Sequence, residues 1–318
     1  MIAHDVVTYI CAMEAGFPFK EVEVRELPYT EDSVPFNEEN LFHFREGKPP
    51  AVFSDDPRYS EGEYYENFVG YRDPKDNKYP AIHVLSIYSA EPDWGMDQDL
   101  NLSPLQRFLG GSQGYRHLRY SLFGIKVGIP HRMMDYFTSK AEREFKSGNN
   151  YWGLRFAGRA LHYLEDLLTP FHVKPFTEIY LLRNLFNREG LYYRIYNYHL
   201  NYERYVGYLL WHGNERLIEA VKYGARMAET LTNESFKNAV LHGYREAKRV
   251  FNPIFEECIR IWGDSMSGRY VKISPDEIDR IRSNWFIDLS CRWLQNVSAL
   301  VRKYIEIFLK PYLGEMLD

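Results

Sequence analysis

Apolar residues recur every three to four positions along most of this chain, which places them on one face of an α-helix. The pattern predicts helices over residues 4 to 15, 131 to 147, 150 to 169, 214 to 231, 233 to 262, 275 to 286 and 288 to 310. Pro311 is expected to close the last of them. The sequence therefore predicts an all-α fold, a multi-helix bundle.

One long interruption separates the first predicted helix from the rest. Residues 17 to 85 contain eight prolines with many Asp, Asn and Tyr between them, which is typical of loops. We interpret this stretch as a loop-rich insertion, and residues 214 to 318 as additional carboxyl-terminal helices. A chain of 318 residues fits one domain spanning 1 to 318.

Composition narrows the class of protein. The chain is 45% hydrophobic, 26% charged and 16% aromatic, with 26 Tyr and a net charge of -5, as in a globular protein rich in amphipathic rings. No run of Lys or Arg offers a basic face to a polyanion, so no stable nucleic-acid partner is expected.

The sequence shows no membrane span and no zinc-knuckle spacing among Cys11, Cys258 and Cys291. The first residues lack the basic head and long apolar stretch of a signal peptide. We therefore expect a cytoplasmic protein, or a secreted one if a signal sequence has been removed.

The chemistry concentrates in residues 160 to 177. His162 and Asp166 are four apart on a predicted helix, so their side chains project from one face. His172 comes ten residues after His162 and would lie about 15 Å from it along a straight helix. Pro170 is expected to bend or end that helix. This spacing suggests two or more metal ions with Asp166 between them, and imidazole with carboxylate favours zinc.

A His followed by an acid four residues later is weak evidence by itself. Four such pairs occur in the chain: His131/Asp135, His162/Asp166, His199/Glu203 and His242/Glu246. The longer string H-x3-D-x5-H, with a Pro two residues before its last His, is far more specific.

The full string, L-H-Y-L-x-D-x-x-x-P-x-H-x-x-x-F-T, resembles the signature of the zinc-dependent phospholipase C and single-strand-specific nuclease family. It is closer to the phospholipase branch. The resemblance spans roughly His4 to Glu203 and implies the all-α bundle of that family. It assigns Asp93, His117, His162 and Asp166 to one zinc, His172 and Glu203 to a second, and His4, Asp166 and the terminal amine to a third.

Several of these assignments compete with neighbouring residues. Asp93 is the match chosen from Ile-Tyr-Ser-Ala-Glu-Pro-Asp-Trp-Gly-Met-Asp-Gln-Asp, in which Glu91, Asp97 and Asp99 remain alternatives. Asp93 is also the candidate general base. His199, four residues before Glu203, is expected to orient that Glu or a substrate phosphate.

The resemblance predicts a phosphodiester hydrolase of the phospholipase C type, with two to three zinc ions per chain and a metal-activated water. Its expected partners are a phospholipid or small phosphodiester substrate and, transiently, a membrane surface. A single-strand nuclease is the alternative within the family. A zinc-binding scaffold without turnover is the other, since Glu165 stands where the family has a small Gly. Neither G-x-S-x-G, G-x-G-x-x-G nor a Walker loop is present.

Overall fold

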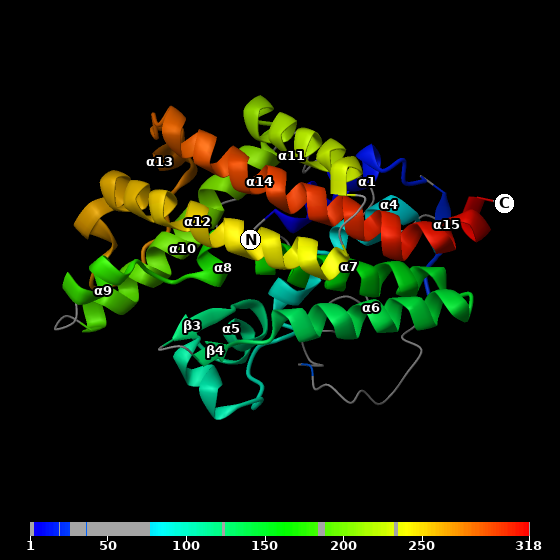
Figure 1. The fold of residues 1–318 in the computed structure, drawn as a ribbon, viewed down its shortest axis with the longest axis horizontal. Helices are drawn as coiled ribbons and strands as arrows, with labels where there is room; N and C mark the ends of the chain where they lie inside the picture. The colour runs from blue at the N-terminus through cyan, green and yellow to red at the C-terminus, as the bar shows by residue number, and fades with distance from the viewer. Residues whose placement is uncertain are drawn as a thin grey trace.

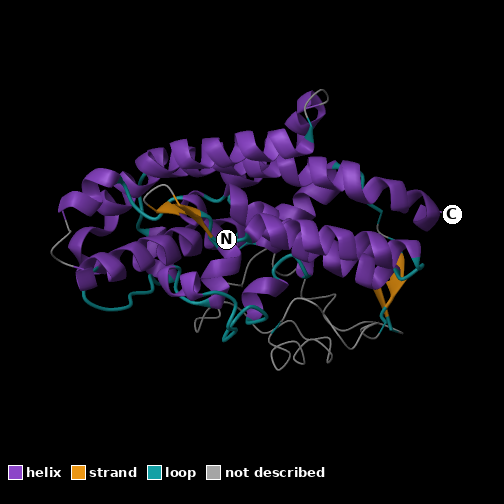
Figure 2. Ribbon diagram, turned by 60° about the horizontal axis from the view of Figure 1, so that its bottom comes forward, coloured by secondary structure: helices purple, strands orange, loops and turns teal. Residues whose placement is uncertain are grey.

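The computed structural model describes residues 3–18, 20–25, 36, 77–122, 125–183, 188–231 and 235–317. Helices dominate this part of the chain (Figure 2), and the predicted all-α class is confirmed. Its strands form two short antiparallel pairs at separate places on the helical body. Most of the predicted insertion, residues 26–35 and 37–76, lies outside the described residues.

The first half of the chain contains several short elements followed by a pair of long helices. Its elements are α1 (His4–Glu14), β1 (Glu21–Glu23), β2 (Lys78–Pro80), α4 (Ala81–Ile87), η3 (Glu91–Trp94), η4 (Pro104–Phe108), α5 (Ser112–His117), β3 (Tyr120–Leu122), β4 (Ile125–Val127), α6 (Pro130–Lys146), α7 (Asn150–Leu168) and α8 (Pro170–Val173). Helices α6 and α7 pack against each other, as expected for predicted neighbours joined by a short turn (Figure 1). Gly148, at φ +78°, makes that turn, and Asn149 caps α7 by accepting from the Trp152 amide.

Helix α7 is the centre of the molecule. All but the first of its residues are buried, including charged ones. It contacts α6, α4, α1, α12, α14 and the 3₁₀ turn η3. A helix that is buried on every side can carry polar groups only where other elements supply hydrogen-bond or charge partners. The polar residues of α7 therefore indicate which other elements must pack against it.

In the second half, every described element of secondary structure is helical. It comprises α9 (Glu178–Arg183), α10 (Arg188–Trp211), α11 (Glu215–Met227), η5 (Ala228–Leu231), α12 (Phe236–Trp262), η6 (Gly263–Met266), α13 (Pro275–Asp279), α14 (Asn284–Tyr304), the π-helical η7 (Ile305–Leu309) and α15 (Lys310–Leu317). Helix α14 packs along α11 and α12 (Figure 1). None of the described helices combines the length and apolar character needed to cross a membrane.

Two predicted boundaries in this half are wrong. The helix expected over 275 to 286 ends at Asp279, and α14 begins at Asn284, where the Ser283 side chain accepts from the Phe286 amide. Pro311 does not close the last helix, which continues to Leu317. The π-helical turn immediately before Pro311 changes the hydrogen-bonding register at the point where proline lacks an amide donor.

The loop-rich stretch is also shorter than predicted. Strands β1 and β2 pair antiparallel with Val22 opposite Tyr79, so the chain leaves and returns at one place. Ala81 then starts the fully buried helix α4, which begins inside the range predicted as loop and packs against α1 and α7. Proline at residue 80 and the short apolar run after it account for the missed helix start.

Gly158 permits the closest approach in this core. A Cβ at this position of α7 would lie 2.7 Å from the Leu85 carbonyl oxygen and 3.0 Å from the Ser89 amide nitrogen. Both are backbone atoms that cannot rotate away. The glycine therefore sets how near the end of α4 lies to α7.

Substituting Gly158→Ala should destabilise the protein by about 1–3 kcal/mol, because overpacking outweighs the gain in helix propensity. Urea unfolding of the two proteins measures this difference. The matched control is Gly314→Ala in α15, where a Cβ meets no atom within 4 Å. That change should be neutral or slightly stabilising, and equal effects of the two substitutions would contradict the packing argument.

Candidate metal centre

The end of α7 brings the central motif together. Thr169 takes an extended conformation, φ -84° and ψ 129°, between α7 and α8, and Pro170 occupies the first turn of α8. The chain therefore leaves the axis of α7 directly before His172. The predicted break at Pro170 is confirmed, and His172 Nδ1 lies 2.8 Å from Asp166 Oδ1 instead of a helix length away.

The two carboxylate oxygens of Asp166 face different histidines. Oδ2 lies 3.2 Å from His162 Nε2 and 2.9 Å from His117 Nδ1. Oδ1 lies near His172 and 3.7 Å from His4 Nε2. A carboxylate that is fully buried and presents its oxygens to separate sets of imidazoles has the arrangement of a bridging ligand.

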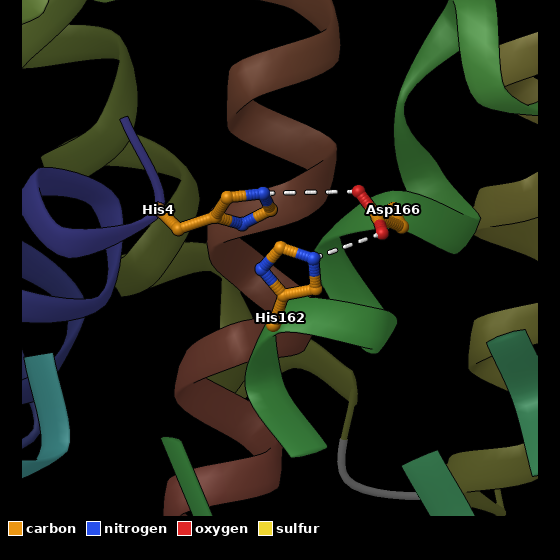
Figure 3. A group of neighbouring side chains, drawn as sticks. All are labelled: His4, His162 and Asp166. Carbon is orange, nitrogen blue, oxygen red and sulfur yellow. Dashed lines mark ion pairs between the residues drawn. The ribbon is translucent and has the colours of Figure 1, made fainter. Parts of the chain in front are cut away.

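His4 reaches this carboxylate from the first helix. Figure 3 shows the rings of His4, on α1, and His162, on α7, each facing a different oxygen of Asp166. The potential ligand atoms of these three residues all lie within 4.8 Å of one another. The described chain begins at residue 3, so the terminal amine expected as a further ligand lies outside the described residues.

A second group joins the 3₁₀ turn η3 to α5. Asp93 Oδ1 lies 3.4 Å from His117 Nδ1 and 3.7 Å from His162 Nε2. Asp93, His117 and His162 can offer one ligand atom each within the same 4.8 Å limit. His162 thus belongs to both groups, and the Asp93 side chain is 20% exposed while Asp166 is buried completely.

A third group lies between α8 and α10. Glu203 Oε1 is 2.8 Å from His172 Nε2 and 3.0 Å from His199 Nε2. The ring of His199 stacks on Phe171, with centroids 5.6 Å apart. His199, expected from sequence only as an orienting residue, therefore lies close enough to serve as a ligand beside His172 and Glu203.

Three of the four histidines around Asp166 are held, at the ring nitrogen turned away from it, by a partner that the sequence did not assign to them. The partners are the Ser89 carbonyl oxygen 2.8 Å from His162 Nδ1, Asp97 Oδ2 3.0 Å from His117 Nε2, and Glu165 Oε2 2.6 Å from His4 Nδ1. When these outer nitrogens donate to their acceptors, the inner nitrogens keep lone pairs directed at the centre. Such outer acceptors are typical of metal-binding histidines.

Two of these partners correct readings made from sequence. Asp97, an alternative ligand, is enclosed by Arg116, Tyr163 and the outer side of His117. Burial raises the pKa of Asp97, but the bonds from His117 and Arg116 outweigh it and lower the pKa below its usual value. Glu165 neither crowds the centre nor faces solvent, because its carboxylate accepts from His4 and from Thr8 Oγ1 at 2.9 Å.

The remaining acids of this segment lie away from the ligand groups. Asp99 is exposed, at φ +57°. Glu91 is fully buried on the other side of η3, where it accepts from Arg155 and, at 2.7 Å, from Arg159 Nε. Burial raises the pKa of Glu91, but the two guanidinium groups outweigh it and lower the pKa to about 2. This pairing attaches the 3₁₀ turn η3, which carries Asp93, to helix α7.

The donor set fits zinc. It combines imidazole nitrogens and carboxylate oxygens, the ligands that zinc takes in hydrolytic sites. His4 Nε2 is buried and has no hydrogen-bond partner among the described residues, its nearest carboxylate oxygens being 3.7 Å away on Asp93 and Asp166. A cation among these three side chains would satisfy a nitrogen whose burial is otherwise costly.

Comparison with known proteins gives a distant likeness. No protein-family model matches the sequence, and no curated protein matches it. Among solved structures, the chain is similar to the alpha toxin of Clostridium absonum, with 14% identity and a TM-score of 0.33 over 98% of this chain and 67% of that one. A second is the alpha-toxin of Clostridium perfringens avian strain SWCP, with 12% identity and a TM-score of 0.28 over 96% and 65%. This chain spans about two thirds of the length of each toxin, and values this low establish no shared function.

Glu91→Gln should destabilise the protein by about 3 kcal/mol near neutral pH, because it leaves two buried guanidinium groups without their counter-charge. A carboxyl group with a lowered folded pKa stabilises above its unfolded pKa and loses that effect as pH falls toward the folded value. The difference between wild type and variant should therefore shrink between about pH 4.5 and pH 2. Urea unfolding across this range measures it. Asp288→Asn, in an exposed ion pair with Arg216, should cost under about 1 kcal/mol. Equal destabilisation by Glu91→Gln and Asp288→Asn would refute the argument that burial makes the Glu91 pairing strong.

Protein purified without chelators should carry two to three zinc ions per chain, as elemental analysis can determine. Asp166→Ala should lose the most metal, since its oxygens face two sets of histidines, whereas Glu203→Ala should empty one position. His242→Ala is the matched control, because His242 also precedes an acid by four residues but is exposed on α12. Absence of stoichiometric metal in the wild type would exclude a metal centre.

Proposed function

We propose that this protein is a zinc-dependent phosphodiester hydrolase of the phospholipase C type. The observation that carries the proposal is the buried Asp166 carboxylate, whose oxygens face separate histidine groups from α1, α5, α7 and α8. Adjacent ions suit an in-line attack on phosphorus, because one can hold the nucleophile while another neutralises the departing oxygen. Zinc bound here would lower the pKa of water and stabilise negative charge on phosphoryl oxygens.

The proposed ligand sets follow the three groups. Asp93, His117, His162 and Asp166 would hold one ion, His172 and Glu203 a second with His199 beside them, and His4 with Asp166 a third. Their outer partners keep the imidazoles in one tautomer and orientation. Since the ligands come from packed helices and short turns, little reorganisation is needed when substrate binds.

Asp93 is the proposed general base. It is the most exposed carboxylate of the centre, at 20% of its side chain, while Asp166 is fully enclosed and Glu203 is 11% exposed. An accessible carboxylate beside the histidines can accept a proton from the attacking water. The buried Arg155 and Arg159 act on it only indirectly, by holding Glu91 two residues earlier in the same turn.

The test is a comparison of substrates at equal enzyme concentration. Phosphocholine release from short-chain phosphatidylcholine, or hydrolysis of an aryl phosphodiester, should exceed nucleotide release from single-stranded DNA and RNA by at least about tenfold. Asp93→Asn should lower kcat by about 10²-fold or more. Asp99→Asn, on the exposed side of the same segment, should leave it unchanged.

Other outcomes select among the alternatives. Faster cleavage of single strands than of lipid or aryl diester would make the protein a nuclease of the same metal chemistry. Zinc-loaded protein that is inert on every substrate would make it a scaffold. Equal kcat for Asp93→Asn and wild type would remove Asp93 as the base while leaving the hydrolase proposal to the substrate comparison.

A further inference from the structure

One face of α10 runs from the candidate metal centre to the protein surface. Glu203, His199, Tyr196 and Tyr192 follow one another at intervals of four, three and four residues, and therefore share that face. Exposure rises along it, from 11% and 22% for the first two side chains to 42% and 51% for the two tyrosines. At about 1.5 Å per residue, Tyr196 lies about 10 Å and Tyr192 about 17 Å along the helix from Glu203.

The exposed end of this face forms a cluster that we call the tyrosine patch: Tyr192, Tyr193 and Tyr196 of α10 with Tyr270 from the segment before α13. The Tyr270 ring packs edge-on against Tyr193 and Tyr196, with centroids 5.1 and 4.9 Å apart. Its hydroxyl lies 3.4 Å from that of Tyr192, and Tyr270 is itself 59% exposed. An exposed aromatic cluster of this kind marks a surface that contacts a partner.

Charge around the patch favours an anionic partner. Between Leu191 and Tyr202, α10 carries one charged side chain, Arg194, and no carboxylate. Arg269 and Lys272 flank Tyr270, and both are exposed. These three cationic side chains flank the patch tyrosines in a chain whose net charge is -5. These positive charges would attract an anionic surface even though the net charge of the protein is negative.

We propose that the tyrosine patch docks the protein on an anionic phospholipid surface. The proposal rests on the proposed phosphodiester hydrolase function and names the surface by which its substrate would be reached. Tyrosine suits the boundary between headgroups and acyl chains, because its ring is apolar and its hydroxyl remains hydrated. The flanking cationic side chains would meet the lipid phosphates. A lipid at the patch would then lie about one to two helical turns from His199 and two to three from Glu203.

Sedimentation of the full-length protein with vesicles tests the surface directly. Wild type should bind vesicles of mixed phosphatidylcholine and phosphatidylserine more tightly than phosphatidylcholine alone, and less tightly as salt is raised. The double variant Tyr192→Ser/Tyr270→Ser should bind about tenfold more weakly. Tyr223→Ser, a substitution of an equally exposed tyrosine on α11, should bind like wild type. Arg269→Glu/Lys272→Glu should remove the preference for anionic vesicles.

Wild type that does not sediment with either vesicle, or a double variant that binds as wild type does, would overturn the proposal. So would light scattering that shows a dimer dissolved by the tyrosine substitutions, since the patch would then bind a second copy. Turnover of a soluble aryl phosphodiester should be the same in wild type and double variant. Vesicle binding through the patch without any turnover would refute the hydrolase proposal alone, and turnover of the soluble diester without vesicle binding would refute the docking surface alone.

Discussion

The pairing of buried polar and charged groups inside α7 is the constraint on which the rest of the structure depends. Arg155, Arg159, Glu165 and Asp166 are all buried in this one helix. Removing a charge from water costs several kcal/mol unless a partner and hydrogen bonds replace the solvent. The partners come from distant parts of the chain: Glu91 from η3, His4 and Thr8 from α1, and His172 from α8. The positions of these elements around α7 are therefore fixed by electrostatics as well as by apolar packing.

The same pairing prepares the candidate metal centre. Glu91 holds the turn that carries Asp93, and Glu165 and Asp97 hold His4 and His117 by their outer nitrogens. Groups that stabilise the fold thus also orient the ligands, because a buried imidazole needs an acceptor on one side before the other can face an ion. A close backbone approach supports this arrangement, since Gly158 lets the end of α4 bring the Ser89 carbonyl to His162.

The side chains of the candidate metal centre differ in their exposure to solvent. Asp166 has no contact with solvent, whereas Asp93 and His199 are each about one fifth exposed. Proposed chemistry and proposed docking meet on α10, where the face bearing Glu203 and His199 continues into the tyrosine patch. A rigid helix that carries both features would keep a fixed distance between a lipid surface and the metal ligands.

The sequence by itself determined the helices of the core and the heart of the candidate site, because both follow from local rules. Apolar periodicity is a property of each segment, and proline disfavours the interior of a helix because it lacks an amide donor, so α7, its break at Pro170 and the pairing of His162 with Asp166 were readable in advance. Tertiary structure fixed where two of the His-acid pairs lie, placing His242 on an exposed helix surface and His199 beside His172. It also gave two acids of residues 91 to 99 partners of their own, pairing Glu91 with two arginines and Asp97 with the outer nitrogen of His117. Those choices depend on which side chains from remote elements lie opposite, and the spacing of residues along one segment carries no information about them.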